Sequence, residues 1–198
     1  MRVALLDYGA GNLHSLAKAL ALSGADVRME SDPSRCLDAD TLVLPGVGSF
    51  SRAAEHIAPA RAALRAAILQ DYPVIGVCLG MQLLFDSSEE GRGEGLGVIP
   101  GTVTRIDATR VPQIGWNTLD DATDPAVAAS RLRAAYYANS FVCRPRNTGD
   151  VRAWTTHECD RFPAVVRSRR AVGVQFHPEK SSVAGVRLLR VLLEECRS

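Results

Sequence analysis

The chain has 198 residues, of which 46% are hydrophobic and 23% charged, and its formal net charge is +1. These values are typical of a globular protein with one sizeable core, so we expect a single domain over residues 1–198. The small net charge gives no electrostatic footprint for nucleic acid or a membrane surface. The first apolar run, Val3–Leu6, is too short for a signal peptide, and no run approaches the roughly 18 apolar residues of a spanning helix. We therefore expect a cytoplasmic protein.

The first half of the chain alternates between strand-length apolar runs and helical periodicity. Strands are predicted at Val3–Leu6, Asp26–Met29, Leu42–Leu44 and Val74–Val77, and helices at Leu13–Leu22, Ser51–Ile57 and Pro59–Leu69. Gly24 is placed to end the first helix, and Pro59 to begin the third. This βαβ alternation predicts an α/β fold with a mostly parallel sheet and helices on both faces.

The second half of the chain lacks this alternation and consists mostly of short β-like segments. Short β-like segments lie at Val103–Ile106, Tyr136–Val142, Val151–Thr156, Ala164–Val166 and Val172–Gln175, and we expect them to add antiparallel strands to one edge of the sheet. A final helix is predicted over Val183–Cys196, with Ser181 or Ser182 as its cap. The glycine-rich stretch Gly91–Gly97 follows a helix rather than a strand, which argues against a dinucleotide-binding loop. The adjacent pair Glu89-Glu90 is predicted to be solvated surface.

The segment Gly76–Gly80 predicts a nucleophile elbow, because a short apolar strand leads directly into a cysteine between two glycines and then into a helical segment. The glycines allow tight packing at the turn, and the position at a helix N-terminus favours the thiolate of Cys78. The cysteines show no Cys-x-x-Cys pair and the histidines no spacing of four, so we expect reduced thiols and neither a metal ion nor a cofactor. The remaining cysteines, Cys36, Cys143, Cys159 and Cys196, are predicted to be small residues without chemistry.

A cysteine nucleophile needs a base, and His177 is the best candidate. In an extended segment His177 and Glu179 point the same way, and Pro178 between them stiffens the pair. The carboxylate can then hold one imidazole nitrogen while the other faces the thiol. A surface His-Pro-Glu turn is the alternative reading of this segment taken alone.

An acyl intermediate on the thiol also needs donors for its oxyanion. The amide of Leu79 is one, and the turn Pro45–Ser49, which follows a predicted strand, offers a second. A phosphate-binding loop is the alternative there, but no Gly-Lys-Ser/Thr ending follows. The two glycines around Val47 would let its peptide flip at small cost.

With these residues assembled, the chain resembles class I glutamine amidotransferases over nearly its whole length. More narrowly, it resembles the glutaminase subunits of imidazole glycerol phosphate synthases. The Cys elbow and the His-Pro-Glu segment are features of the broad class, whereas the Asp-Tyr-Gly-x-Gly-Asn start and the Gly-Trp-Asn segment are much narrower signals. The matching segments are Asp7–Asn12, Leu44–Phe50, Gly76–Phe85, Glu94–Gly101, Val111–Asn117 and Gly173–Ser181.

This resemblance implies a flavodoxin-like fold, a triad of Cys78, His177 and Glu179, and glutamine as the substrate. It implies that glutamine is bound by Gln82 and by backbone around Gly46, Val47, Gly48, Leu79, Ser140 and Phe141. It also implies a heterodimer with a (βα)₈-barrel cyclase subunit, into which ammonia passes for synthesis of imidazole glycerol phosphate and aminoimidazole carboxamide ribotide in histidine biosynthesis. The candidates for the docking face are Asn12, Trp116 and Lys180. The alternative for Trp116 is a position in the hydrophobic core.

Two positions depart from the family pattern: Asn139 stands where a histidine is usual, and Gln113 where histidine or asparagine is common. They motivate an alternative function, a paralogous subunit that feeds ammonia to a different synthase in specialised metabolism. A catalytically silent subunit on the same fold is a third hypothesis.

Overall fold

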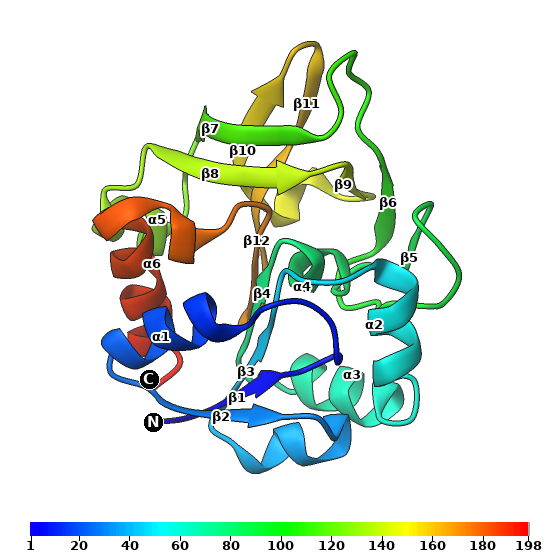
Figure 1. Ribbon diagram of the computed structural model, residues 1–198, viewed down its shortest axis with the longest axis vertical. Coiled ribbons are helices and arrows are strands. Elements are labelled where there is room, and N and C mark those ends of the chain that lie inside the picture. Colours follow the sequence, from blue (N-terminus) through cyan, green and yellow to red (C-terminus); the bar gives the residue numbers. More distant parts are fainter. Residues whose placement is uncertain (198) are drawn as a thin grey trace.

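The centre of the molecule is a seven-stranded sheet with the strand order β10-β11-β12-β4-β3-β1-β2 (Figure 1), in a computed structural model that describes residues 1–197. The strands β2, β1, β3, β4 and β12 run parallel, and β11 and β10 continue the sheet antiparallel. The predicted mostly parallel sheet with antiparallel edge strands is therefore confirmed. The strands are β1 (Arg2–Leu6), β2 (Asp26–Glu30), β3 (Thr41–Leu44), β4 (Val74–Val77), β10 (Val151–His157), β11 (Asp160–Ser168) and β12 (Ala171–Val174).

Two details of the expected β structure were wrong. The segment Val172–Gln175 was expected as an antiparallel addition, but β12 lies parallel to β4 inside the sheet, with Gly173 beside Gly76. All four residues of β12 are buried, as is typical of an interior parallel strand. The segment Tyr136–Val142 was expected as one strand, but the chain breaks at Ser140.

The break at Ser140 sends the two halves into two smaller sheets apart from the central one. The strand β8 (Ala134–Asn139) pairs with β7 (Gln113–Thr118), and β9 (Phe141–Pro145) pairs with β6 (Gly101–Arg105), which also pairs with the short β5 (Ser87–Ser88). These two sheets lie beside β10 and β11 (Figure 1), so the segments Val103–Ile106 and Tyr136–Val142 do not add strands to the edge of the central sheet as expected.

Helices cover both faces of the central sheet, as predicted. On one face lie α1 (His14–Leu22), α5 (Pro125–Ser130) and α6 (Ser182–Glu195), and on the other α2 (Phe50–Ile57) and α3 (Arg61–Leu69). The short α4 (Leu79–Gln82) follows β4, and single-turn or 3₁₀ segments lie at η1 (Pro33–Asp38), η2 (Thr148–Asp150) and η3 (Pro178–Lys180). Pro59 does not begin α3, because a turn lies between Pro59 and the first helical residue, Arg61. Gly24 follows the end of α1 with φ +90°, as expected for a left-handed helix terminator.

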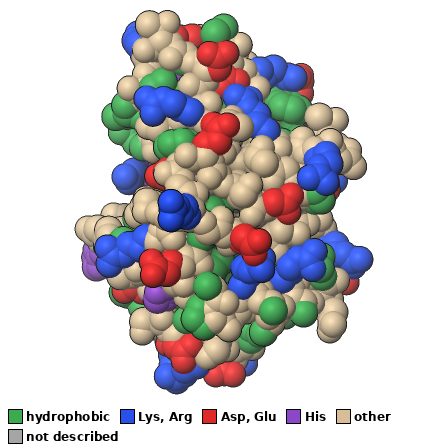
Figure 2. All heavy atoms as spheres, turned by 90° about the vertical axis from the view of Figure 1, so that its right-hand side faces the viewer, with side chains coloured by type: hydrophobic (Ala, Val, Ile, Leu, Met, Phe, Trp, Pro, Cys, Tyr) green, Lys and Arg blue, Asp and Glu red, His purple; other side chains and the backbone are tan. Residues whose placement is uncertain are grey.

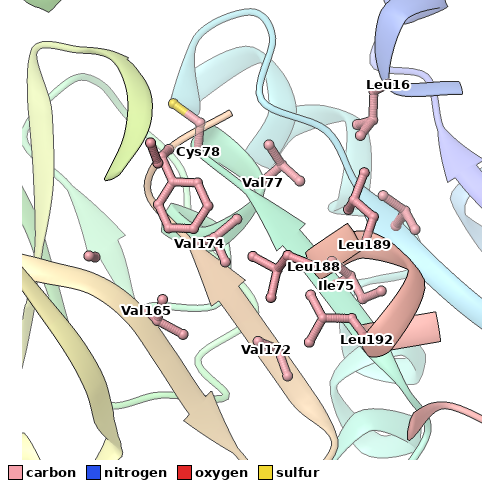
Figure 3. Packing of buried hydrophobic residues seen from close by; sticks show 14 of the residues in the cluster. Leu16, Ile75, Val77, Cys78, Val165, Val172, Val174, Leu188, Leu189 and Leu192 are labelled. Carbon is pink, nitrogen blue, oxygen red and sulfur yellow. The ribbon is translucent and has the colours of Figure 1, made fainter. Parts of the chain in front are cut away.

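Alternate residues of each parallel strand point to opposite faces, which divides the core into two layers. Leu188, Leu189 and Leu192 of α6 pack over the sheet side chains Ile75 and Val172 (Figure 3). Burying a leucine side chain of this kind contributes about 1.5–3 kcal/mol to folding. The same layer reaches up to Cys78 at the carboxyl end of β4, so the position of the candidate nucleophile is set by the core itself.

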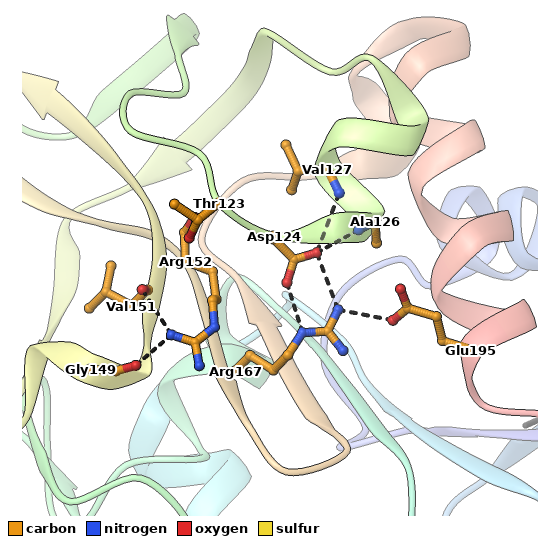
Figure 4. Close-up of polar contacts among 9 residues, drawn as sticks. All are labelled: Thr123, Asp124, Ala126, Val127, Gly149, Val151, Arg152, Arg167 and Glu195. Carbon is orange, nitrogen blue, oxygen red and sulfur yellow. Dashed lines mark hydrogen bonds and ion pairs between the residues drawn. The ribbon is translucent and has the colours of Figure 1, made fainter.

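A charge network centred on the buried Asp124 ties α5 and α6 to β11 (Figure 4). Asp124 is 1% exposed, and its carboxylate accepts hydrogen bonds from Arg167 Nε at 2.7 Å and from the amide of Ala126 at 2.9 Å. The Arg167 guanidinium also donates to Glu195 at 2.9 Å. Burial alone would lower the pKa of Arg167, but its hydrogen bonds to both carboxylates and their charges outweigh burial and raise that pKa. The network therefore holds its charges paired.

On the face shown in Figure 2, basic and acidic side chains are interspersed, in keeping with the small net charge. Among residues 1–197, no helix has the length and apolar character needed to cross a membrane.

Candidate active site

Cys78 sits on a strained turn between β4 and α4. Its backbone has φ 49° and ψ −105°, a region that side-chain-bearing residues rarely occupy, and its amide donates to the carbonyl oxygen of Val174 at 2.7 Å. The side chain is 7% exposed. The predicted elbow is therefore present, with the sulfur presented at the carboxyl edge of the sheet.

The glycines around the elbow are required by close approach of the backbone. A Cβ on Gly76 would lie 2.5 Å from the carbonyl oxygen of Gly80, and one on Gly80 would lie 2.0 Å from that of Leu44. A Cβ on Gly46, in the turn after β3, would lie 2.8 Å from the Cβ of Cys78. The turn after β3 is thus packed directly against the cysteine.

His177 and Glu179 form the predicted pair, at the entry to η3. His177 Nδ1 and Glu179 Oε1 are 2.9 Å apart, and both side chains are 7% exposed. The alternative of a surface His-Pro-Glu turn is excluded by this burial. The imidazole also borders Gly46, where an added Cβ would lie 3.0 Å from His177 Cε1, so it stands beside Cys78.

The electrostatic surroundings of His177 favour its charged form. Burial by itself lowers the pKa of His177, but hydrogen bonds to Cys78 and Glu179 and the negative charges of both groups raise it to about 10. A histidine that holds its proton between a cysteine and a carboxylate is placed to give that proton to a leaving group.

A pocket of about 220 Å³ opens onto Cys78. The elbow, the turn after β3 and the β8–β9 break contribute to it, which brings together most of the predicted binding residues. Its lining consists of Gly46, Gly48, Cys78, Leu79, Gln82, Glu90, Ala138, Asn139, Ser140 and Phe141. Val47 is not part of the lining. Its side chain faces Gly11, where an added Cβ would lie 2.6 Å from the Cβ of Val47.

Two side-chain amides converge on the backbone at one wall of this pocket. Gln82 Nε2 donates to the carbonyl oxygen of Phe141 at 3.1 Å, and Asn139 Nδ2 donates to the same oxygen at 3.2 Å. The predicted binding residue Gln82 therefore fixes the backbone at the β8–β9 break. The Oδ1 atom of Asn139 is buried without a hydrogen-bond partner among the described residues.

Glu90 is a site residue that the sequence reasoning missed, since Glu89-Glu90 was predicted to be solvated surface. Glu90 Oε2 accepts the amide of Phe50 at 2.7 Å, at the start of α2, and the residue lines the pocket. Glu89 accepts the amide of Arg105 at 3.1 Å. A carboxylate in the loop after the nucleophile's helix is the one signal in the sequence that could have identified Glu90.

The three candidate docking residues are all exposed. Trp116, on β7, is 57% exposed, which excludes the core alternative. Its ring lies edge-on to Tyr136 at 6.5 Å between centroids, and Lys180 Nζ lies 5.9 Å from the same tyrosine ring. Asn12, in the loop before α1, is also exposed. Trp116, Tyr136 and Lys180 thus form one continuous surface beside His177.

A thiol on a strand-to-helix elbow, paired with a buried His–Glu couple at the edge of a parallel sheet, is an arrangement typical of acyl-transfer enzymes with a cysteine nucleophile. The family model for "Glutamine amidotransferase class-I" matches residues 4–194. The chain belongs to the class I glutamine amidotransferase family.

The similar curated proteins make the assignment narrower. The chain is 41% identical to the imidazole glycerol phosphate synthase subunit HisH of Natronomonas pharaonis, over 98% of this chain and 94% of the relative. It is 39% identical to HisH of Corynebacterium glutamicum, over 95% of each chain. It is also 41% identical to the chloroplastic imidazole glycerol phosphate synthase hisHF of Arabidopsis thaliana, over 96% of this chain and 34% of that longer protein.

Solved structures support the fold. A crystal structure described as a glutamine amidotransferase superposes with a TM-score of 0.73 at 20% identity, over 99% of both chains. PurLQS from Thermotoga maritima gives a TM-score of 0.69 at 16% identity, over 98% of both chains.

Proposed function

We propose that the chain is the glutaminase subunit of an imidazole glycerol phosphate synthase, with Cys78, His177 and Glu179 as its catalytic triad. The observation that carries this proposal is the buried His177–Glu179 pair beside the strained Cys78 elbow, at the mouth of a pocket large enough for an amino acid. The near full-length similarity to HisH subunits supports the choice of glutamine as substrate and of histidine biosynthesis as the pathway.

The reaction begins when Cys78 Sγ attacks the side-chain amide carbon of glutamine. The carbonyl oxygen then gains negative charge. Backbone N–H groups of Leu79, at the start of α4, and of the turn Gly46–Gly48 are placed to stabilise this oxyanion by hydrogen bonds. His177, oriented through Nδ1 by Glu179, gives its proton to the departing nitrogen, so ammonia leaves and a thioester remains. His177 then takes a proton from water and the hydroxide attacks the thioester, so glutamate is released and the Cys78 thiolate and the His177 imidazolium are restored.

Glutamine binding follows from the lining of the pocket. The carboxylate of Glu90 provides the negative charge that an α-ammonium group requires. Backbone at Ser140 and Phe141, held by Gln82 and Asn139, forms the opposite wall. We assign Glu90, Gly46, Gly48, Leu79, Gln82, Ser140 and Phe141 to substrate binding, and Val47 to the packing and peptide orientation of the turn after β3.

The partner is the (βα)₈-barrel cyclase subunit of the synthase, in the cytoplasm. Relatives carry the name of a synthase subunit, and the Arabidopsis relative is a longer hisHF protein. Trp116, Lys180 and Asn12 are our candidates for the docking face, because an exposed tryptophan beside a lysine and an aromatic ring is a typical interface anchor.

The decisive experiment reconstitutes the synthase with the cyclase subunit of a related enzyme. The Cys78→Ala variant should lose glutamine-dependent synthesis of imidazole glycerol phosphate, while synthesis from ammonium salts continues. Glutamine use by this variant would contradict the triad. Failure of the wild-type chain to support glutamine-dependent synthesis with any such cyclase would contradict the assignment of the partner.

The alternative of a paralogue serving another synthase is not favoured. The departure at Asn139 motivated it, yet the curated relatives above are subunits of imidazole glycerol phosphate synthase at about 40% identity. A catalytically silent subunit is also not supported, because a silent protein has no use for a buried nucleophile, base and orienting carboxylate together.

A further inference from the structure

Gln175 is a fully buried polar residue to which the mechanism above assigns no role. It follows the last residue of β12, is 0% exposed, and donates from Nε2 to the sulfur of Cys78 at 3.5 Å. A nitrogen-to-sulfur distance of this size is normal for a hydrogen bond to the larger sulfur atom. The Oε1 atom of the same amide is buried with no hydrogen-bond partner among the described residues.

The backbone leaves Gln175 little freedom to move away from Cys78. Its amide donates to the carbonyl oxygen of Ala164 at 2.9 Å, which continues the β11–β12 ladder. The preceding residue, Val174, lies beside Val77 in the parallel register, and its carbonyl oxygen accepts the amide of Cys78 at 2.7 Å. The two chain segments are therefore fixed side by side, and the side-chain amide of Gln175 is directed at the Cys78 sulfur.

A buried amide with one unpaired atom costs free energy, so its position beside the sulfur calls for an explanation. An N–H donor stabilises a thiolate more than a thiol, because hydrogen bonds to an ionised acceptor are the stronger ones. We propose that Gln175 is a positioning residue that holds the Cys78 sulfur and stabilises its thiolate from within the core, outside the lining of the substrate pocket. This inference rests on the proposed function for its catalytic meaning, but the hydrogen bond itself can be tested without glutamine.

The test is the pH dependence of Cys78 alkylation by iodoacetamide, followed by mass spectrometry of the Cys78 peptide. In Gln175→Met the midpoint of reactivity should move to higher pH by about one unit, a tenfold loss of thiolate at a given pH below the midpoint. In Gln175→Glu the added negative charge should move the midpoint further in the same direction. Gln113→Met is the matched control, because Gln113 is also a buried glutamine with an unpaired Oε1 but lies on β7.

An unchanged midpoint in a folded Gln175→Met variant would overturn the proposal. A move to lower pH would also overturn it, since it would mean that the amide oxygen faces the thiol and stabilises the neutral form. If the variants do not fold, the side-chain amide protons of Gln175 in the wild-type protein give the same information by NMR. They should shift with pH as Cys78 ionises and should lose that shift in Cys78→Ala, and the proposal fails if the two titrations are the same.

Kinetics in the reconstituted synthase separate this role from a purely structural one. Gln175 is absent from the pocket lining, so Gln175→Met should lower kcat for glutamine about tenfold near neutral pH with little change in KM. Raising the pH should restore much of the loss, and a loss that is the same at every pH would contradict the inference. If the chain proves not to use glutamine, the alkylation result still decides on the hydrogen bond.

Discussion

The amide of His177 donates a hydrogen bond to the carbonyl oxygen of Tyr136 at 2.8 Å. Tyr136 thus connects two regions: its ring lies between Trp116 and Lys180 on the exposed surface, and its backbone holds the candidate base. Ser181 completes the connection, because its hydroxyl accepts the amide of Tyr136 at 2.9 Å and donates to the carbonyl oxygen of His177 at 2.7 Å. A partner that moves the Tyr136 ring would therefore act on a segment that is hydrogen-bonded to His177, the proposed catalytic base.

The first prediction concerns this hydroxyl. Ser181→Ala should lower the free energy of unfolding by about 1–3 kcal/mol, because it removes the hydroxyl that bonds both the Tyr136 amide and the His177 carbonyl oxygen. It should also lower kcat by loosening His177. Urea unfolding and glutaminase assays measure both effects. The exposed neighbour Ser182 is the control, and equal losses in Ser182→Ala would contradict the account.

A second prediction concerns the orienting carboxylate. Glu179→Gln should keep the fold but lower kcat by about 10²–10⁴-fold, because a neutral amide no longer stabilises the imidazolium charge or fixes the tautomer of His177. Steady-state glutaminase kinetics in the reconstituted synthase test this, with synthesis from ammonium salts as the internal control. A kcat within threefold of the wild type would remove Glu179 from the triad.

Stability should depend on the protonation of His177. Its pKa is about 10 in the folded protein, above the ordinary value near 6.5, so the folded state binds the proton more tightly. This stabilisation is fully present below about pH 6.5 and is lost as the pH rises through about 10. Urea unfolding between pH 6 and 10 should show a fall in the wild type that is reduced in His177→Asn. The exposed His14→Asn variant should follow the wild type, and a parallel curve for His177→Asn would refute the prediction.

The turn after β3 should not tolerate a side chain at Gly46. Gly46→Ala would place a Cβ 2.8 Å from that of Cys78 and 2.9 Å from the carbonyl oxygen of Val77. Something must shift, so we expect a loss of stability of about 1–3 kcal/mol, typical of overpacking, together with loss of glutaminase activity. Thermal unfolding and kinetics check this, and a fully active, equally stable variant would show that the turn is not packed as described.

The exposed tryptophan gives a prediction about binding. Trp116→Ala should weaken binding of the cyclase partner at least tenfold, as expected for a hot-spot aromatic, while leaving the isolated chain as stable as before. Isothermal titration calorimetry measures the first effect and urea unfolding the second. Leu22, on α1 and 63% exposed, is the matched control for loss of an exposed hydrophobic side chain. Equal affinities of the wild type and both variants for the cyclase partner would show that Trp116 is not part of the docking face.

The sequence was sufficient for those parts of the site that depend on local spacing. The elbow at Cys78 and the pair His177–Glu179 are each made of residues that are close together in the sequence. The pattern of strands and turns places both motifs at the same edge of the sheet. The roles of Gln175 and Glu90 depend on contacts across the fold, which spacing does not encode. The domain assignment, residues 1–198 as one domain, stays a prediction.

The errors in the predicted fold have a similar origin. The segment Val172–Gln175 is short and mostly apolar, and such a run does not reveal on its own whether its neighbour runs parallel or antiparallel. The sequence pattern did not predict the strand β7, because Gln113, Gly115 and Asn117 are not residue types typical of strands. It forms a strand because β8 supplies its partners, with Gly115 beside Tyr137.

The left-handed turn at Cys78 has a consequence for the stability of the chain. At φ 49° a glycine would be the less strained residue, so folding stability and the presence of a thiol make opposite demands at this position. A variant Cys78→Gly with higher thermal stability and no activity would show how far the two demands diverge at a single position. The strain at position 78 would then be a local cost in stability that only the proposed chemistry of the sulfur explains.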